Sequence, residues 1–300
     1  GANVLVAQYW GKGEPAEIRK VLSIVYRISV CISLLFSLGA LCCPEIIMSI
    51  FTNDAEVIAA GCRYLTVIGW VYPLYALGNN TIMLLRAVGT VRISLVVYST
   101  SFMVNVFFNW VFIFGNLGAP RLEIQGAALA TAIARVVEFL IVAWFLFRRE
   151  HKIQFRLHDL RRFDRVMFGA FVRAATPIIF NDMIWAIGNS MITIIMGRMG
   201  KEFVAANSIN SVVMQFASVA LMGTSSAAAA IIGNTIGAGE YDRARDRART
   251  LMYIAAMIGV TAGVLIFTIR PFILGFYNIT EVTRGYAMSF MAITSVLVFF

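Results

Sequence analysis

The sequence has little charge and few of the residues that build soluble catalytic or metal sites. Of its 300 residues, 14% are charged, whereas a soluble domain carries about 25%. There are two histidines and four cysteines, and the cysteines show no CxxC or other metal-ligand spacing. Hydrophobic residues make up 60% of the chain, more than a globular core of this length can bury. This composition excludes a soluble enzyme, a secreted disulfide scaffold and a disordered chain.

Several catalytic motifs are also absent from the sequence. It has no GxxxxGK[ST] phosphate loop, no HExxH and no GxSxG. We therefore expect no enzyme activity and no cofactor. Cys42, Cys43 and Cys62 could meet near one membrane face in a disulfide, or they could be small apolar helix residues.

What the sequence does contain is long apolar runs, which predict an all-α polytopic membrane protein. Short alternating strands of a lipid-facing barrel would not give such runs. Eight spans are expected, at 21–43, 57–85, 93–115, 126–147, 166–196, 204–236, 250–275 and 283–300. Residues 1–10 resemble the end of an earlier helix, and the last residues stop inside an apolar run, so we expect a chain truncated at both ends.

The basic residues are distributed unevenly between the predicted loops. The net charge is +9, and sixteen Lys and Arg fall in the loops of one side against five on the other. Such a bias identifies the basic side as cytoplasmic in a multi-pass protein of the cell membrane, and it explains the charge without nucleic acid. Within the longest polar stretch, 148–165, basic residues alternate with apolar ones such as Phe155. This pattern predicts a cytoplasmic interfacial segment that is attracted to anionic membrane lipid.

The same stretch separates two halves that resemble each other. Gly11-Lys12-Gly13-Glu14 recurs as Gly237-Ala238-Gly239-Glu240, 226 residues later. Both turns fall on the basic side, so each repeat holds an even number of helices, which we take to be six, in parallel orientation. We therefore predict an N-terminal bundle at 1–147, a linker at 148–165 and a C-terminal bundle at 166–300.

Polar residues recur every three or four positions on four of the predicted helices. Such spacing places them on one face of a helix, and that face either lines a water-filled cavity or bonds to a neighbouring helix. The four faces are Ser94, Tyr98, Ser101, Asn105 and Asn109; Thr131, Arg135 and Glu138; Asp182, Asn189 and Thr193; and Asn207, Ser211, Gln215, Ser218, Met222 and Ser225.

Two carboxylates lie within the apolar spans, where charge is costly and often functional. Glu138 has Arg135 three residues earlier, so we expect an internal ion pair. Asp182 has no basic neighbour one turn away. It is the better candidate for contact with a proton, a cation or a substrate, and a hydrogen bond to another helix is the alternative.

The chain resembles the MATE (multidrug and toxic compound extrusion) family along nearly its whole length. The resemblance is carried by Ala7 to Glu14, Leu85 to Gly89, Asn105 to Gly115, Gly126 to Thr131 and Gly237 to Glu240. In family terms the chain runs from helix 2 to helix 10 of twelve. The resemblance implies two six-helix bundles and a secondary antiporter that exports organic, often cationic, compounds by alternating access in exchange for sodium or protons.

The resemblance also implies candidate site residues. An Asn-x-x-x-Asp pair and a threonine that form a first-bundle cation site in some members correspond to Asn105, Asn109 and Thr131, with asparagine in place of the acid. Other members use an acid on helix 7, where Asp182 lies. Asp182, Glu138, Asn189, Asn207 and Gln215 are the further candidates. Alternatives are a lipid or lipid-linked oligosaccharide flippase of the same superfamily, or a membrane enzyme or receptor-like protein.

Overall fold

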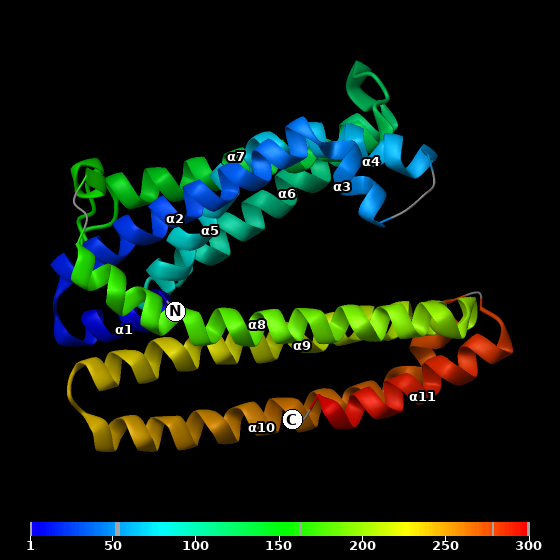
Figure 1. Cartoon of the computed structure of the whole chain (residues 1–300). Helices are drawn as coiled ribbons and strands as arrows, with labels where there is room; N and C mark the ends of the chain where they lie inside the picture. Colours follow the sequence, from blue (N-terminus) through cyan, green and yellow to red (C-terminus); the bar gives the residue numbers. More distant parts are fainter. Residues whose placement is uncertain (1, 52–54, 162–163, 278, 299–300) are drawn as a thin grey trace. The chain divides into compact units, whose positions relative to one another are not determined.

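A computed structural model describes residues 2–51, 55–161, 164–277 and 279–298. Thr193, Arg198 and Lys201 lie in helices, but their side chains are outside the description, as are Arg161 to Phe163 of the predicted linker. The described residues form helices joined by short turns, and seven helical segments are long and apolar enough to cross a membrane. The prediction of an all-α polytopic membrane fold is confirmed (Figure 1).

The chain divides into two compact units, which we call the first unit, Ala2–Phe171, and the second unit, Val172–Phe300. The helices of the first unit are α1 (Ala2–Lys12), α2 (Pro15–Cys42), α3 (Pro44–Phe51), α4 (Ala55–Ile68), α5 (Tyr72–Ala87), α6 (Arg92–Phe114) and α7 (Glu123–Arg148). Short 3-10 turns lie at Gly69–Val71, Asn116–Gly118 and Leu157–Arg161.

The second unit holds most of α8 (Arg165–Met199), with α9 (Lys201–Gly237), α10 (Tyr241–Gly275) and α11 (Glu281–Leu297). Helices α9, α10 and α11 pack on one another around buried Ala206, Leu274, Ala287 and Met291. The last predicted span corresponds to α11, which has 17 residues.

The single span predicted at 57–85 corresponds to one apolar segment, Ala55–Ala87, which a 3-10 turn interrupts. Helix α4 ends at Ile68, a 3-10 turn follows, and α5 begins at Tyr72 with Pro73 in its first turn. Proline has no N–H to continue the preceding helix and fits well in a first turn, so Pro73 explains the break. All four cysteines are free thiols, so the possible disulfide is not formed. Cys31, Cys42 and Cys62 are helix residues, whereas Cys43 lies between α2 and α3.

The repeated GxGE sequence forms the same turn in both units. Gly13 and Gly239 have φ of +74° and +80°. Gly13 N donates to Trp10 O and Glu14 N to Tyr9 O, and Gly239 N and Glu240 N donate to the equivalent Ile236 and Thr235 carbonyls. This is a Schellman motif, in which a left-handed residue lets the backbone close the end of a helix. Gly89, at φ +76°, ends α5 in the same way.

The polar stretch that follows α7 packs onto the first unit. Ile153 and Phe155 are 1% and 4% exposed and belong to the core of that unit, so Phe155 does not lie at the lipid interface as expected. Arg19 Nη1 donates to the Ile153 carbonyl, and Glu150 accepts from the Lys152 and Ile153 amides. The segment is attached to α2 because the Arg19 side chain binds one of its backbone carbonyls. No sequence pattern predicts a contact of this kind.

Asp164 fixes the start of α8. One carboxylate oxygen accepts from the backbone N–H groups of Val166 and Met167, and the other lies 3.1 Å from Lys20 Nζ. The backbone hydrogen bond from Met167, followed by the Lys20 ammonium, holds the pKa of the Asp164 carboxyl below its ordinary value of 3.8. The first turns of α8 are therefore attached to the first unit.

Candidate functional site

The clearest polar cluster of the first unit lies between α6 and α7, which pack along their length. Glu138 on α7 is 1% exposed. Its Oε2 atom is 2.5 Å from Arg135 Nη1 and accepts a hydrogen bond from Ser101 Oγ on α6 at 3.3 Å. The predicted ion pair is confirmed, and Ser101 is added to it.

The two members of this pair differ in their surroundings. The Glu138 side chain is 2% exposed, whereas the Arg135 side chain is 33% exposed. The Arg135 guanidinium carbon lies 4.7 Å from the centroid of the Tyr75 ring on α5. Among the described residues, Glu138 Oε1 is buried without a hydrogen-bond partner. A buried carboxylate oxygen without a donor is costly, so this oxygen can accept a hydrogen bond or contact a cation.

A second set of contacts continues along the same two helices. Asn105 Nδ2 donates to Thr131 Oγ1 at 3.3 Å, and Asn109 Nδ2 donates to Asn105 Oδ1 at 2.9 Å. Asn109 Oδ1 is buried and has no partner among the described residues. The structure therefore brings Asn105, Asn109 and Thr131 together, with one buried carbonyl oxygen left to accept a donor or a cation.

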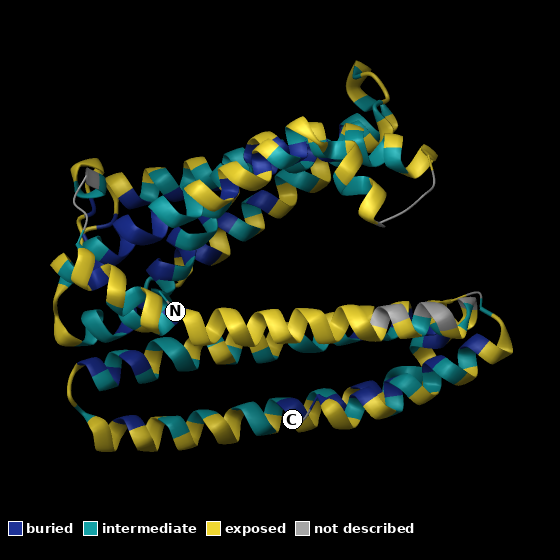
Figure 2. Ribbon diagram, viewed as in Figure 1, coloured by how far each residue is buried: buried dark blue, intermediate teal, exposed yellow. Residues whose placement is uncertain are grey.

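Polar residues of the second unit are arranged differently. Asp182 and Asn189 are exposed on α8, as Figure 2 shows for most of that helix. Asn189 Nδ2 donates to the Trp185 carbonyl of its own helix. On α9, Gln215 is exposed and Asn207 is half-buried, while Ser211 and Ser218 donate to carbonyls one turn earlier. The Ser211 and Ser218 hydroxyls therefore bond within α9 itself.

Some polar contacts were missed by the sequence analysis. The Tyr26 hydroxyl lies 2.6 Å from Thr81 Oγ1, and Asn80 Nδ2 donates to Ser29 Oγ at 2.7 Å. Ser37 Oγ donates to the Gly69 carbonyl. The signal was present, because Tyr26, Ser29, Ser33 and Ser37 recur every three or four residues on α2.

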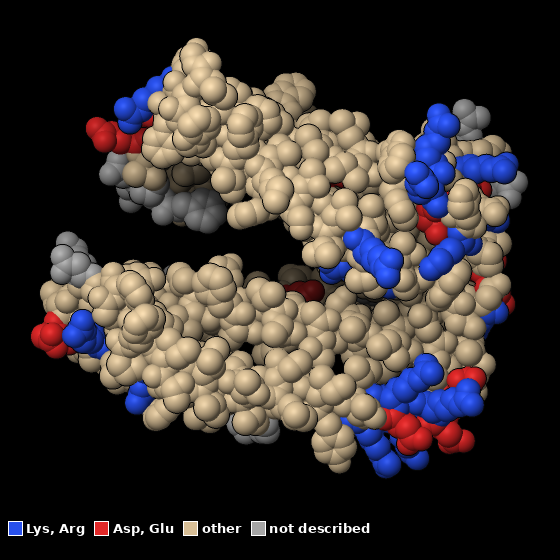
Figure 3. All heavy atoms as spheres, turned by 180° about the vertical axis from the view of Figure 1, so that it is seen from behind, with Lys and Arg blue, Asp and Glu red and all other residues tan. Residues whose placement is uncertain are grey.

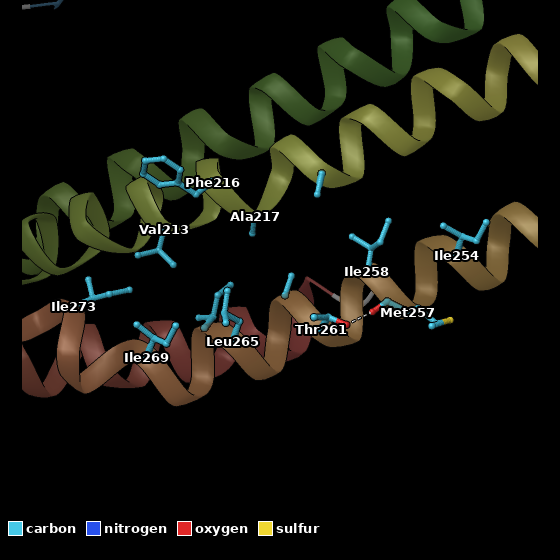
Figure 4. A pocket seen from close by; sticks show the side chains of 13 residues that line it. Val213, Phe216, Ala217, Ile254, Met257, Ile258, Thr261, Leu265, Ile269 and Ile273 are labelled. Carbon is cyan, nitrogen blue, oxygen red and sulfur yellow. Dashed lines mark hydrogen bonds between the residues drawn. The ribbon is translucent and has the colours of Figure 1, made fainter.

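The largest cavity that we describe is apolar and lies between α9 and α10 (Figure 4). Its volume is about 640 Å³. Val213 and Ala217 point toward it from α9, and Ile258 and Leu265 from α10. Among the described residues, no group of three or more His, Cys, Asp or Glu side chains is arranged to hold a metal ion.

Charged side chains lie mainly at the ends of the helices. Figure 3 shows one face, on which Lys, Arg, Asp and Glu gather at the helix ends while the long surfaces between them carry other residues. Such a surface is typical of a protein that spans a bilayer.

Comparisons with known proteins agree with this fold. The family model described as MatE matches residues 1–111 and 177–300. The probable multidrug resistance protein YoeA of Bacillus subtilis is 24% identical over 98% of this chain, and the probable multidrug resistance protein NorM of Thermotoga maritima is 25% identical over 89%. The chain spans 64% and 57% of the lengths of these two relatives.

Solved structures show the same architecture. A MOP superfamily transporter from Pyrococcus furiosus superposes with a TM-score of 0.88 at 18% identity, covering 100% of this chain and 66% of that one. A MATE protein in a bent conformation superposes with a TM-score of 0.85 at 17% identity, covering 100% of this chain and 65% of that one. At these identities the likeness shows the fold alone.

Proposed function

Because the chain belongs to the MatE family, whose members are transporters, we propose that it forms part of a secondary antiporter in the cell membrane. The antiporter exports organic, often cationic, compounds by alternating access in exchange for sodium ions or protons. The names of the relatives as multidrug resistance proteins support this proposal. The basic loops, including 148–165, lie on the cytoplasmic side, and the protein needs no cofactor besides the coupling ion.

The observation that carries the proposal is the set of unpartnered acceptors between α6 and α7. Asn109 Oδ1 has no donor among the described residues and lies beside the bonded pair Asn105 and Thr131. Amide and hydroxyl oxygens are the hard ligands that a small cation prefers. We assign these three residues to a sodium site, and Glu138, with its unpartnered Oε1, to a second cation or proton contact.

Asp182 has the role of an exchange site in this proposal. Its side chain is exposed and is in none of the ion pairs found among the described residues. A single carboxylate attracts either an organic cation or the coupling ion, so the two compete for it. Asn189, Asn207 and Gln215 supply neutral hydrogen-bonding groups along the path of the substrate.

A flippase would take a different polar lining. Recognition of a lipid phosphate favours gathered Arg and Lys side chains. The polar face of α7 instead carries Arg135 in an ion pair with Glu138. We therefore favour an organic solute over a lipid-linked sugar as the substrate.

The test is transport by the full-length protein in vesicles under an imposed sodium or proton gradient, with a fluorescent organic cation as substrate. We expect movement that one gradient drives, and loss of that movement in Asp182→Asn. Asp242→Asn, an exposed acid at the start of α10, is the matched control and should transport normally. Full gradient-driven export by Asp182→Asn would refute the assigned role of Asp182.

The cation site needs its own measurement. Asn109→Asp adds a carboxylate at the unpartnered oxygen and should lower the sodium concentration at which transport or sodium binding is half-maximal. Asn109→Ala should raise it. An unchanged sodium dependence in both variants would remove Asn105, Asn109 and Thr131 from the coupling mechanism.

A further inference from the structure

A second apolar cavity lies inside the first unit, at the end where the segment after α7 packs. Its volume is about 420 Å³. Helix α2 contributes Val30, α5 contributes Leu77, α7 contributes Ala143, and the following segment contributes Leu157 and Leu160. A cavity of this size and lining is within the range that holds a ligand with a hydrocarbon body.

Cationic residues line this cavity or directly follow its lining residues in the sequence. Arg27 lines it, and its guanidinium donates to the Leu160 carbonyl, which fixes the edge of the cavity. Arg148 follows the lining residue Phe147, and Arg156 stands between the lining residues Phe155 and Leu157. Both Arg148 and Arg156 are exposed. An apolar interior with cationic groups at the edge is complementary to an amphiphile with an anionic head.

The cavity between α9 and α10 provides an internal comparison. It is larger, at about 640 Å³, and its lining consists of apolar side chains and Thr261, with no arginine or lysine (Figure 4). Hydrocarbon chains can enter both cavities, but an arginine belongs to the lining of the first-unit cavity and none belongs to the lining of the other. We therefore expect the two cavities to differ in their preference between anionic and neutral lipids.

We propose that the cavity bounded by α2, α5, α7 and Leu157–Leu160 binds an acyl chain of an anionic phospholipid from the adjacent leaflet. The lipid phosphate contacts Arg148 and Arg156 at the edge. The site explains why residues 148–165 combine apolar and basic side chains although Phe155 is buried in the protein. It is independent of the transported substrate.

The experiment uses the full-length protein in vesicles that contain phosphatidylglycerol or phosphatidylcholine carrying a photoactivatable group on one acyl chain. After irradiation, mass spectrometry locates the labelled peptides. We expect labelling of 139–147 and 155–160 to be stronger with phosphatidylglycerol, by about fivefold for each arginine that contacts the phosphate. Labelling of the α9 and α10 cavity should be equal for the two lipids.

Two kinds of variant separate the head group from the acyl chain. Arg148→Gln and Arg156→Gln change exposed residues and should each lower the phosphatidylglycerol preference about fivefold while keeping phosphatidylcholine labelling. Ala143→Leu fills the cavity and should reduce labelling by both lipids. Ala262→Leu, which fills the α9 and α10 cavity, is the matched control and should leave labelling of 139–147 unchanged.

Three results would overturn the proposal. The first is equal labelling of the first-unit cavity by both lipids. The second is an unchanged lipid preference in both arginine variants. The third is loss of labelling when a transported organic cation is added at saturating concentration, since that would make the cavity a substrate site.

Discussion

The polar faces of the two units have similar sequence spacing and different structures. In the first unit, Ser101 and Asn105 of α6 bond to Glu138 and Thr131 of α7. In the second unit, the hydrogen bonds described for the face of α9 run to carbonyls of the same helix, as for Ser211 and Ser218. A polar residue every three or four positions therefore identifies a face, but not whether that face joins helices or meets water or substrate.

The difference assigns separate tasks to the two faces. Side chains that bond across helices have little freedom and stabilise the packing of α6 on α7. Exposed side chains such as Asp182 and Gln215 add little to stability and stay available to a ligand. Substitutions in the first unit should therefore change stability as well as ion coupling, and those in the second unit should change transport with little effect on stability.

The largest effect is expected from Arg135→Ala. The variant leaves the carboxylate of Glu138, which is 2% exposed, without its ion-pair partner. Loss of one member of a buried pair costs about 3 kcal/mol of unfolding free energy or more. Reversible unfolding in mixed micelles measures this cost.

The double variant Arg135→Ala/Glu138→Ala is the control for this prediction. It removes both charges, so it should recover most of the stability that Arg135→Ala loses. If the double variant is no more stable than Arg135→Ala, the unpaired charge of Glu138 is not the source of the cost.

A smaller effect is expected from Asn105→Ala. It removes the hydrogen bond that Asn105 donates to Thr131 and the carbonyl oxygen that accepts from Asn109 Nδ2. Hydrogen bonds between membrane helices contribute about 0.6 kcal/mol each, so the loss should be about 1 kcal/mol in the same unfolding experiment. No loss of stability would mean that water or an ion replaces the amide between α6 and α7.

Gln215→Ala is the matched test in the second unit and should have almost no effect on stability. The side chain is exposed on α9, and such substitutions change stability by about 0.5 kcal/mol or less. A cost equal to that of Asn105→Ala would contradict the contrast between the two units, because it would show that the α9 face bonds to a partner.

The smallest expected effect is a local response to pH at the start of α8. The folded-state pKa of Asp164 lies below 3.8. The ionised carboxylate therefore stabilises the start of α8 above pH 3.8, and this stabilisation is lost as the pH falls through the lowered pKa. Hydrogen exchange at Val166 and Met167, corrected for the intrinsic rate, should accelerate in that range. Asp164→Ala should show fast exchange at every pH, and protection that does not change with pH in the unsubstituted protein would exclude the cap.

The sequence predicted those parts of the fold and site that depend on one helix at a time. Apolar runs located the helices, and the three-residue spacing of Arg135 and Glu138 predicted their ion pair. The break before α5 follows from Pro73. Asn105 and Thr131 were grouped through the family resemblance, and the structure brings them together. Their binding of sodium stays a prediction.

Features that depend on how two helices are aligned could not be predicted in this way. The bond between Tyr26 and Thr81 joins residues 55 positions apart, and periodicity on α2 does not identify its partner on α5. Burial of Phe155 was unexpected for a related reason. The composition of residues 148–165 is typical of a surface segment. In the structure, Arg19 and Arg27 donate to backbone carbonyls of this segment, which packs with apolar side chains buried.

The three left-handed glycine turns have a consequence for genetic variation. Gly13, Gly89 and Gly239 have open space where a side chain would begin, so crowding does not forbid substitution, but their positive φ disfavours every L-residue with a side chain. The turns are closed by backbone groups, so the residues that accept these bonds can differ freely, as Tyr9 and Thr235 do. A scan of all single-codon changes should therefore find Gly13, Gly89 and Gly239 intolerant, although the residues that bond to them accept many replacements.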